Sequence, residues 1–440
     1  MTFQELNISA PILRALTDKN YEQPTPIQQQ AIPYALDGED VLGLAQTGTG
    51  KTAAFAIPII QHLDQPDLLR QRGIKALILT PTRELAIQIQ ECVTDYSHYT
   101  RVRSCVIFGG VGQAPQVQQL QRGVDILIAT PGRLLDLIGQ GIISLSTIRH
   151  FVLDEADRML DMGFIHDIRR IIPLLPKRRQ TLFFSATMPQ SIATLSKSIL
   201  HNPQRVEVAP VSSVVDTIEQ QLYYVEKPQK IDRLAQVLTA DENRSALVFS
   251  RTKHGADKIA RKLKARGILC DAIHGNKSQT ARQRALSNFK DNKTRVIVAT
   301  DIAARGIDIA NLELVVNFDM PDVAETYVHR IGRTGRAGHS GLAVTFCTEE
   351  DLPMLRDIQK LTGRRLDAQN TLQESLAEAA QTAKEQPAQP ARQQSKAPKG
   401  EQSTQPKSQP TQGRRPHNRR PKSPQSGNRR EQYSRGRNVK

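Results

Sequence analysis

The segment Ala45-Gln46-Thr47-Gly48-Thr49-Gly50-Lys51-Thr52 follows an apolar run at residues 41–44 and precedes an alanine-rich, helix-compatible stretch. This order of strand, loop and helix is the context that a phosphate-binding loop requires. Glycines let backbone N–H groups converge on phosphate oxygens, the helix N-terminus adds positive potential, and Lys51 supplies a full charge. The Thr52 hydroxyl is suited to ligate magnesium. Ala45 stands where the strict pattern has glycine, but its side chain need not touch phosphate. The segment therefore predicts a nucleotide site to which all eight residues contribute.

A second element, at residues 151–157, indicates hydrolysis in addition to binding. Phe151-Val152-Leu153 has the pattern of a buried strand and delivers Asp154-Glu155-Ala156-Asp157 to the same sheet edge. A carboxylate at that position, Asp154, suits magnesium held partly through water. Its neighbour Glu155 is placed to orient or deprotonate the attacking water. Without this context, the four residues would be interpreted as a solvated helix start with acids near the positive end of the dipole.

Short β-branched apolar runs alternate along the chain with longer stretches of helical period, which is typical of βαβ units around a parallel sheet. The runs form two groups, at 76–79, 125–128, 151–153 and 181–184, and then at 246–249, 295–298 and 314–316. In both groups a polar turn with Thr or Ser follows the strand. We therefore predict an α/β fold with two related domains, and we expect the chemistry at the turns beyond the carboxyl ends of the strands.

The boundary between the predicted domains lies near residue 210. Residues 208–214 show neither strand nor helix period and include a proline, so the interdomain linker is predicted at 208–216. The domains then cover 1–207 and 217–367. Two sheet edges that face each other across such a joint would form a cleft.

The charge of the chain is concentrated at its C-terminus. The formal net charge is +16, and residues 384–440 hold 15 Lys or Arg against 3 Asp or Glu, which leaves only +4 for residues 1–383. The only large apolar side chains in that segment are Tyr433 and Val439, too few to offset the entropy of ordering. We predict that residues 368–440 form a disordered basic tail. It would serve as a nonspecific tether for a polyanionic partner through counterion release, or else as a solubilising linker.

Several classes of protein are disfavoured by simple features. No apolar run approaches the roughly 18 residues of a membrane span, and the first residues lack the pattern of a signal peptide. The four cysteines are far apart and form no CxxC pair, which argues against a zinc site and a disulfide framework. A cytoplasmic protein with no membrane partner is expected.

Residues 154–157 spell the signature of DEAD-box RNA helicases, and the chain resembles that family from about residue 3 to residue 347. The other motifs occur in the family's order: Pro81-Thr82-Arg83-Glu84-Leu85-Ala86, Gly109-Gly110, Thr130-Pro131-Gly132-Arg133, Ser185-Ala186-Thr187, Arg305-Gly306-Ile307-Asp308 and His329-Arg330-Ile331-Gly332-Arg333-Thr334-Gly335-Arg336. The compact core and basic tail are most similar to the bacterial RhlE-type branch. The resemblance implies two RecA-like domains in tandem.

An element that recognises adenine is predicted near the N-terminus. Tyr21 and then Pro24-Thr25-Pro26-Ile27-Gln28 form a rigid turn that ends in a side-chain amide. An amide carries a donor and an acceptor, which match the N6 and N7 edge of adenine and mismatch guanine. By the resemblance, this element selects ATP, and an upstream aromatic residue, here Phe3, stacks on the base. A plain helix-initiating turn is the alternative.

The resemblance also assigns roles to residues of the second domain. The segment 329–336 spaces its cations by three with two glycines between them, which makes a poor free-standing helix. Arg333 and Arg336 match arginine fingers, each able to contribute about a thousandfold in rate. Asp308 matches a ribose contact. Asp157, Ser185, Thr187 and His329 match the polar network that couples the nucleotide site to RNA.

Turns beyond the strands offer backbone N–H, hydroxyl and guanidinium donors suited to RNA phosphate and sugar oxygens. The candidates are Pro81, Thr82, Arg83, Gly110, Thr130, Arg133, Thr300 and Arg305. Aromatic residues make up 4% of the chain and Trp is absent, so stacking platforms for bases are scarce. We expect sequence-independent binding of single-stranded RNA. The resemblance implies ATP-driven domain closure that bends one strand and separates short duplexes without processive tracking.

Three functions stay open at this point. The first is an RNA-stimulated ATPase, acting as a monomer, that unwinds short duplexes. The second is an ATP-gated RNA clamp or scaffold whose hydrolysis only times release. The third is a DNA helicase, against which only the family resemblance weighs. Ribosomal precursors and RNA-turnover complexes are expected as partners from the family alone.

Overall fold

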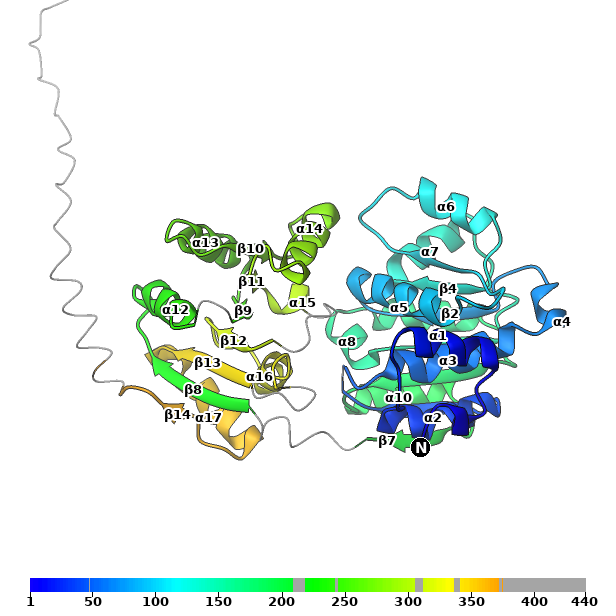
Figure 1. Ribbon diagram of the computed structural model, residues 1–440, viewed down its shortest axis with the longest axis horizontal. Helices are drawn as coiled ribbons and strands as arrows, with labels where there is room; N and C mark the ends of the chain where they lie inside the picture. Colours follow the sequence, from blue (N-terminus) through cyan, green and yellow to red (C-terminus); the bar gives the residue numbers. More distant parts are fainter. Residues whose placement is uncertain are drawn as a thin grey trace, which may run out of the picture. The chain divides into compact units, whose positions relative to one another are not determined.

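The computed structural model describes residues 1–46, 48–208, 218–241, 244–304, 312–335, 341–371 and 374. Within these residues the chain forms two seven-stranded parallel sheets with helices packed around each (Figure 1). The predicted α/β class and the tandem RecA-like domains are confirmed. Among the described helices, none is long and apolar enough to span a bilayer.

The first sheet has the strand order β3-β4-β2-β5-β6-β1-β7. Its strands are β1 (Val41–Leu44), β2 (Ala76–Leu79), β3 (Ser104–Ile107), β4 (Ile126–Ala129), β5 (His150–Leu153), β6 (Gln180–Ser185) and β7 (Gln204–Glu207). The helices of this domain are α1 (Ala10–Asp18), α2 (Pro26–Leu36), α3 (Lys51–Leu63), α4 (Pro66–Leu69), α5 (Arg83–Tyr96), α6 (Ala114–Gln121), α7 (Pro131–Gly139), α8 (Ala156–Asp161), α9 (Ile165–Ile171) and α10 (Gln190–Ile199), with 3-10 turns η1 (Gln4–Leu6) and η2 (Ile172–Leu174). Because all strand pairs are parallel, every strand ends at the same edge.

The second sheet has the order β10-β11-β9-β12-β13-β8-β14. Its strands are β8 (Ile218–Tyr224), β9 (Ala246–Phe249), β10 (Cys270–Ile273), β11 (Val296–Ala299), β12 (Leu314–Asn317), β13 (Gly341–Cys347) and β14 (Asp367–Ala368). Its helices are α12 (Lys230–Thr239), α13 (Lys253–Lys264), α14 (Gln279–Lys290), α15 (Asp301–Ala304), α16 (Ala324–Ile331) and α17 (Leu352–Thr362), with a 3-10 turn η3 (Glu349–Asp351).

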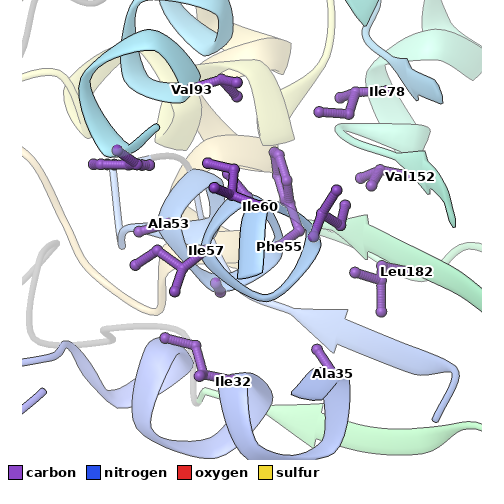
Figure 2. Packing of buried hydrophobic residues seen from close by; sticks show 14 of the residues in the cluster. Ile32, Ala35, Ala53, Phe55, Ile57, Ile60, Ile78, Val93, Val152 and Leu182 are labelled. Carbon is purple, nitrogen blue, oxygen red and sulfur yellow. The ribbon is translucent and has the colours of Figure 1, made fainter. Parts of the chain in front are cut away.

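Both faces of the first sheet are buried, which explains why its strands are apolar without alternation. Ile78 of β2 packs with α2, α3 and α5, whereas its neighbours Leu77 and Leu79 belong to the cluster on the other face. Figure 2 shows Phe55 and Ile60 of α3 in the first of these clusters. This packing fixes the carboxyl edge of the sheet, where the polar turns begin.

The predicted tail begins too early. Ala368 pairs in parallel with Leu222 of β8, and the side chain of Asn370 exchanges two 2.8 Å hydrogen bonds with the backbone of Tyr224. Residues 367–370 therefore complete the second sheet. Most of the predicted linker, from residue 209, and the tail from residue 375 lie outside the described residues.

Candidate nucleotide and RNA site

The predicted phosphate loop connects β1 to α3. Gly48 and Gly50 have φ angles of +86° and +92°, in the region that favours glycine. At Gly50 the requirement is also steric, because an added Cβ would overlap the side-chain amide nitrogen of Gln28. The loop is therefore shaped by residues on both sides of it. Thr47 lies outside the described residues.

Polar side chains hold this loop from within. The Lys51 side chain is buried, and its Nζ donates to the carbonyl oxygen of Ala45 at 2.9 Å. The Thr49 hydroxyl donates to the carbonyl oxygen of Gln46 at 2.8 Å. Thr52 is half-buried in the first turn of α3. The lysine charge thus lies across the loop, where a phosphate group would replace the carbonyl as its partner.

Gln28 is engaged at both ends of its amide. Its Oε1 accepts from the backbone N–H of Thr25 at 2.9 Å, which closes a capping box at the start of α2. Its Nε2 donates to the carbonyl oxygen of Gly50 at 3.0 Å. The structure therefore joins the predicted adenine-recognition turn directly to the phosphate loop.

The two aromatic residues predicted beside the base differ in exposure. Phe3 is 3% exposed and packs in the cluster with Leu6 and Ile12, so no open ring face is available for stacking in this structure. Tyr21 is 42% exposed, and its ring lies 6.0 Å from that of Tyr96. Hydrophobic burial of the N-terminal turn accounts for the position of Phe3.

The two carboxylates that follow β5 are almost completely buried. Asp154 is 3% exposed, and one of its oxygens accepts from the backbone N–H of Glu155 at 3.0 Å. Burial raises the pKa of Asp154 to about 6, with Lys51 acting in the opposite direction and Glu155 in the same one. Glu155 has a φ of +54°, which is uncommon for a non-glycine residue and indicates a constrained turn.

Arg158 is a partner that the sequence reasoning missed. Its Nη1 donates to both carboxylate oxygens of Glu155, at 2.8 and 2.7 Å, and both side chains are buried. The i, i+3 spacing on α8 was the available signal. The residue predicted to activate water is therefore held in an ion pair.

Removing Arg158 should destabilise the protein through this ion pair. Arg158→Met is expected to lower the free energy of unfolding by about 3 kcal/mol, since the Glu155 carboxylate would be left buried without its cation. Urea unfolding of the full chain measures the change. The double variant Glu155→Gln/Arg158→Met should recover part of the loss. Equal stability of Arg158→Met and the unmodified protein would contradict the structural role of the pair.

The predicted coupling residues of the first domain share one hydrogen-bond network. Asp157 accepts from the backbone N–H and the hydroxyl of Thr187, at 2.9 and 3.0 Å. Ser185, at the end of β6, accepts from the backbone N–H of Asp157 at 3.3 Å and donates to the carbonyl of Thr187 at 2.8 Å. These bonds therefore join the turn after β5 to the end of β6 and the turn that follows it. His329 lies on α16, in the second domain.

The predicted RNA-contacting turns follow β2, β3 and β4. Thr82 and Thr130 are the N-caps of α5 and α7, and Pro81 is buried beside Thr82. Arg83 lies against Gly110, where an added Cβ would overlap its guanidinium group. Arg133 donates to the carbonyl of Val111 at 2.9 Å, while its Nη1 has no partner among the described residues. Backbone, hydroxyl and guanidinium donors therefore gather on this half of the edge.

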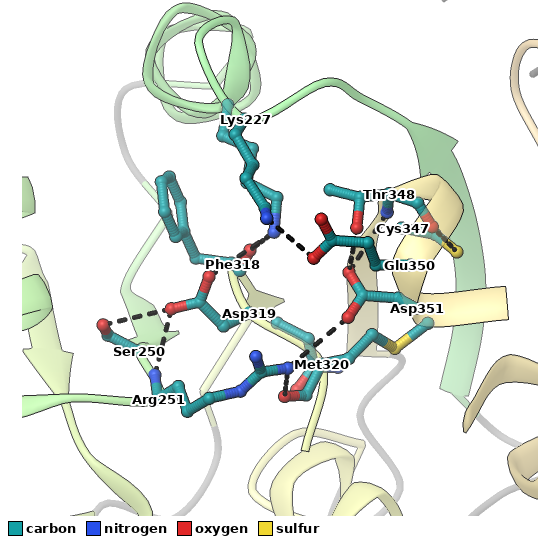
Figure 3. Close-up of polar contacts among 12 residues, drawn as sticks. Lys227, Ser250, Arg251, Phe318, Asp319, Met320, Cys347, Thr348, Glu350 and Asp351 are labelled. Carbon is teal, nitrogen blue, oxygen red and sulfur yellow. Dashed lines mark hydrogen bonds and ion pairs between the residues drawn. The ribbon is translucent and has the colours of Figure 1, made fainter. Parts of the chain in front are cut away.

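In the second domain, Thr300 follows β11 directly and precedes α15, and Arg333 is buried after α16. Arg305, Asp308 and Arg336 lie outside the described residues. The turns after β9, β12 and β13 hold one another through polar contacts (Figure 3): Asp319 accepts from the Ser250 hydroxyl and the Arg251 backbone.

Arg330 belongs to the motif at residues 329–336, but the sequence reasoning gave it no role. It is 2% exposed and forms two 2.6 Å bonds with the carboxylate of Asp301. It also donates to Asn317 and to the backbone of Asp319, and stacks over the ring of Phe249. This arginine ties α16 to the ends of the strands, and its partners are too far apart in sequence for a local pattern to show them.

Comparisons with known proteins agree with this arrangement. A family model described as DEAD/DEAH box helicase matches residues 25–195, and one described as helicase conserved C-terminal domain matches residues 229–338. The DEAD-box ATP-dependent RNA helicase CshA of Bacillus subtilis is 42% identical over 86% of this chain and 76% of its own length. The RNA helicase CrhR of Synechocystis is 44% identical over 83% of this chain and 74% of its own.

Solved structures show the same likeness. Dbp5 of S. cerevisiae bound to RNA and ADP BeF3 is 30% identical, with a TM-score of 0.75 over 87% of this chain and 98% of that one. A DEAD box protein from Methanococcus jannaschii is 38% identical, with a TM-score of 0.50 over 84% and 99%. The fold and the site define a two-domain nucleotide-dependent helicase. The chain belongs to the DEAD-box family of ATP-dependent RNA helicases.

Proposed function

We propose that this protein hydrolyses ATP when RNA is bound and uses the cycle to open or remodel short RNA duplexes locally, without processive movement. One observation carries the proposal. Along the carboxyl edge of the first sheet, the turns with RNA-contacting donors follow β3, β4 and β2, and the nucleotide-binding elements follow β5, β6 and β1. A single packed sheet thus supports both half-sites as neighbours, so that occupation of one can affect the other.

The proposed roles follow from this geometry. The phosphate loop and Lys51 bind the β- and γ-phosphates, Gln28 recognises adenine, and Glu155 orients the attacking water after it leaves Arg158. From the second domain, Arg333 and Arg336 stabilise charge on the γ-phosphoryl group, and Asp308 contacts ribose. Because the fingers belong to the other domain, hydrolysis would depend on closure of the two domains. His329 would then meet the network of Asp157, Ser185 and Thr187.

Thr52 and Asp154 are the residues that would hold Mg²⁺, which supplies charge neutralisation at the phosphates. The site suits Mg²⁺ because of Asp154. This carboxylate is buried and its pKa is raised, and a cation beside it would stabilise its ionised form. The described residues include no cluster of three or more acidic, His or Cys side chains that could hold a metal. Phosphate oxygens and water would therefore complete the shell.

The pH dependence of ATP hydrolysis tests the state of Asp154. Its raised pKa means that the free enzyme loses the ionised form as the pH falls through about 6. We expect kcat/KM for ATP to fall by about tenfold per pH unit below that point, since kcat/KM reports the free enzyme. Circular dichroism at each pH separates this effect from unfolding. A flat kcat/KM between pH 5 and 7 would contradict the assignment.

Strand displacement tests the function as a whole. With ATP, the protein should separate the strands of a short duplex that has a single-stranded overhang. With a nonhydrolysable analogue, it should bind the same duplex but should not go through repeated cycles of strand separation. ATP turnover should rise with RNA and not with DNA of the same sequence. Equal release of strands with and without hydrolysis would favour the ATP-gated clamp, and equal stimulation by DNA would contradict the choice of RNA. Action as a monomer on ribosomal precursors or in RNA turnover, a cytoplasmic location, and RNA tethering by the tail stay predictions.

A further inference from the structure

A large basic cavity lies at the amino edge of the first sheet, away from the site described above. Its volume is about 1010 Å³, and its lining includes Lys75, Arg103 and Asp125, which directly precede β2, β3 and β4. These strands are four residues long, so roughly 13 Å of sheet separates the cavity from the turns at the carboxyl edge. The cavity is therefore distinct from both the nucleotide half and the RNA half of the site.

Arginine dominates the wall of this cavity. Its five arginines, all exposed, are Arg70, Arg72, Arg101, Arg103 and Arg122. The two acidic side chains, Asp64 and Asp125, are already engaged. Asp125 forms a 2.5 Å ion pair with the buried Lys75 and accepts from a backbone N–H at 2.9 Å, and Asp64 accepts from another at 3.1 Å. The two carboxylates therefore bind backbone N–H groups and Lys75, and in the part of the chain that the structure describes they form no ion pair with the exposed arginines of the cavity.

These guanidinium groups have few internal partners. Only Arg103 donates to a carbonyl, that of Arg122, at 2.9 Å; within the described ranges, no ion pair or side-chain hydrogen bond is recorded for the other four. Some exposed cations elsewhere in the described chain are held in ion pairs, such as Lys19 with Asp95 and Lys227 with Glu350. Like charges gathered in a concave surface raise the local potential and attract an anionic partner.

We propose that this cavity is a second binding site for the RNA phosphate backbone, used by the part of the RNA that extends beyond the primary site. Guanidinium groups suit phosphate because they donate two parallel hydrogen bonds to it. The basic tail of the chain is excluded as the occupant by its own charge of +12. An acidic protein is the weaker candidate, because the wall offers few of the large apolar side chains that anchor a protein partner.

The sheet order gives the RNA a path to this cavity. β3 is the edge strand, with Arg103 before it and the turn of Gly109 and Gly110 after it. A strand that leaves the primary site at this turn reaches the cavity by passing around β3, without crossing the packed faces of the sheet. The two sites then hold consecutive segments of one RNA molecule.

A triple variant of the full chain, Arg72→Gln/Arg101→Gln/Arg122→Gln, tests the proposal. The matched control is Arg169→Gln/Lys177→Gln/Arg178→Gln, which removes the same charge from exposed residues of the same domain outside the cavity. Fluorescence anisotropy is measured with a single-stranded RNA that only fills the primary site and with a longer RNA. For the longer RNA, the cavity variant should bind roughly tenfold more weakly, and its salt slope should fall by about 2, as for three lost phosphate contacts.

Other outcomes decide against the proposal. Equal losses in the cavity variant and the control would show a general charge effect. An unchanged affinity for the longer RNA, with loss of binding to poly-glutamate, would assign the cavity to an acidic protein. The proposal itself expects that the cavity variant keeps its affinity for the short RNA and its maximal ATPase rate. Because the anisotropy measurement needs no hydrolysis, failure of the proposed unwinding activity would leave this test intact.

Discussion

Glu155→Gln is expected to lower the turnover number for ATP by roughly 10²- to 10⁴-fold while ATP and RNA still bind. The amide keeps the shape of the side chain and can still accept from Arg158, but it cannot take a proton from water. Glu155 is buried beside Asp154, so the substitution alters no exposed group, but it leaves the Arg158 guanidinium without its carboxylate, and stability is therefore measured together with turnover.

The measurement is a single-turnover assay with RNA present, together with binding of a fluorescent ATP analogue. Asp161→Asn, an exposed carboxylate at the end of α8, is the control and should turn over at the normal rate. Thermal unfolding shows whether the Glu155 variant is folded. Substantial turnover by the folded variant would remove the water-activating role from Glu155.

Lys51→Ala is expected to weaken ATP binding by roughly 100-fold, equivalent to about 3 kcal/mol for the loss of a charged hydrogen-bond donor. The effect should be on nucleotide affinity, because Lys51 lies across the phosphate loop and its Nζ already donates to a loop carbonyl. Isothermal titration with ATP measures the change, and RNA affinity without nucleotide is the control. An unchanged ATP affinity would show that the backbone of the loop suffices for binding.

Segments that are continuous in sequence could be predicted from local context alone. The predicted phosphate loop at residues 45–52 and the acidic element at residues 154–157 are each continuous, and each carries its own strand, turn and helix context. Parallel pairing then brings their turns to one edge, as the alternation of strands and helices predicted. The start of the tail was misjudged because β14 is only two residues long and its pairing with β8 is not visible in local composition.

Contacts made only in the folded chain could not be predicted in this way. The partners of Arg330 come from residues 249, 301, 317 and 319, which are joined by the sheet order and not by spacing. The burial of Phe3 depends on which helix packs over the N-terminal turn. The position of Arg158 could have been inferred from its spacing to Glu155, but neither the contact of its Nη1 with both carboxylate oxygens nor the positive φ of Glu155 is visible in the sequence.

The bond between Gln28 and Gly50 has a consequence for nucleotide choice. The Gln28 side chain holds both its own turn and the phosphate loop. A base that draws its amide away would therefore also release the carbonyl oxygen of Gly50. A nucleotide with the wrong base would leave that bond in place. GTP should therefore be a poor substrate even when its concentration overcomes weak binding, with discrimination appearing in the maximal rate as well as in affinity.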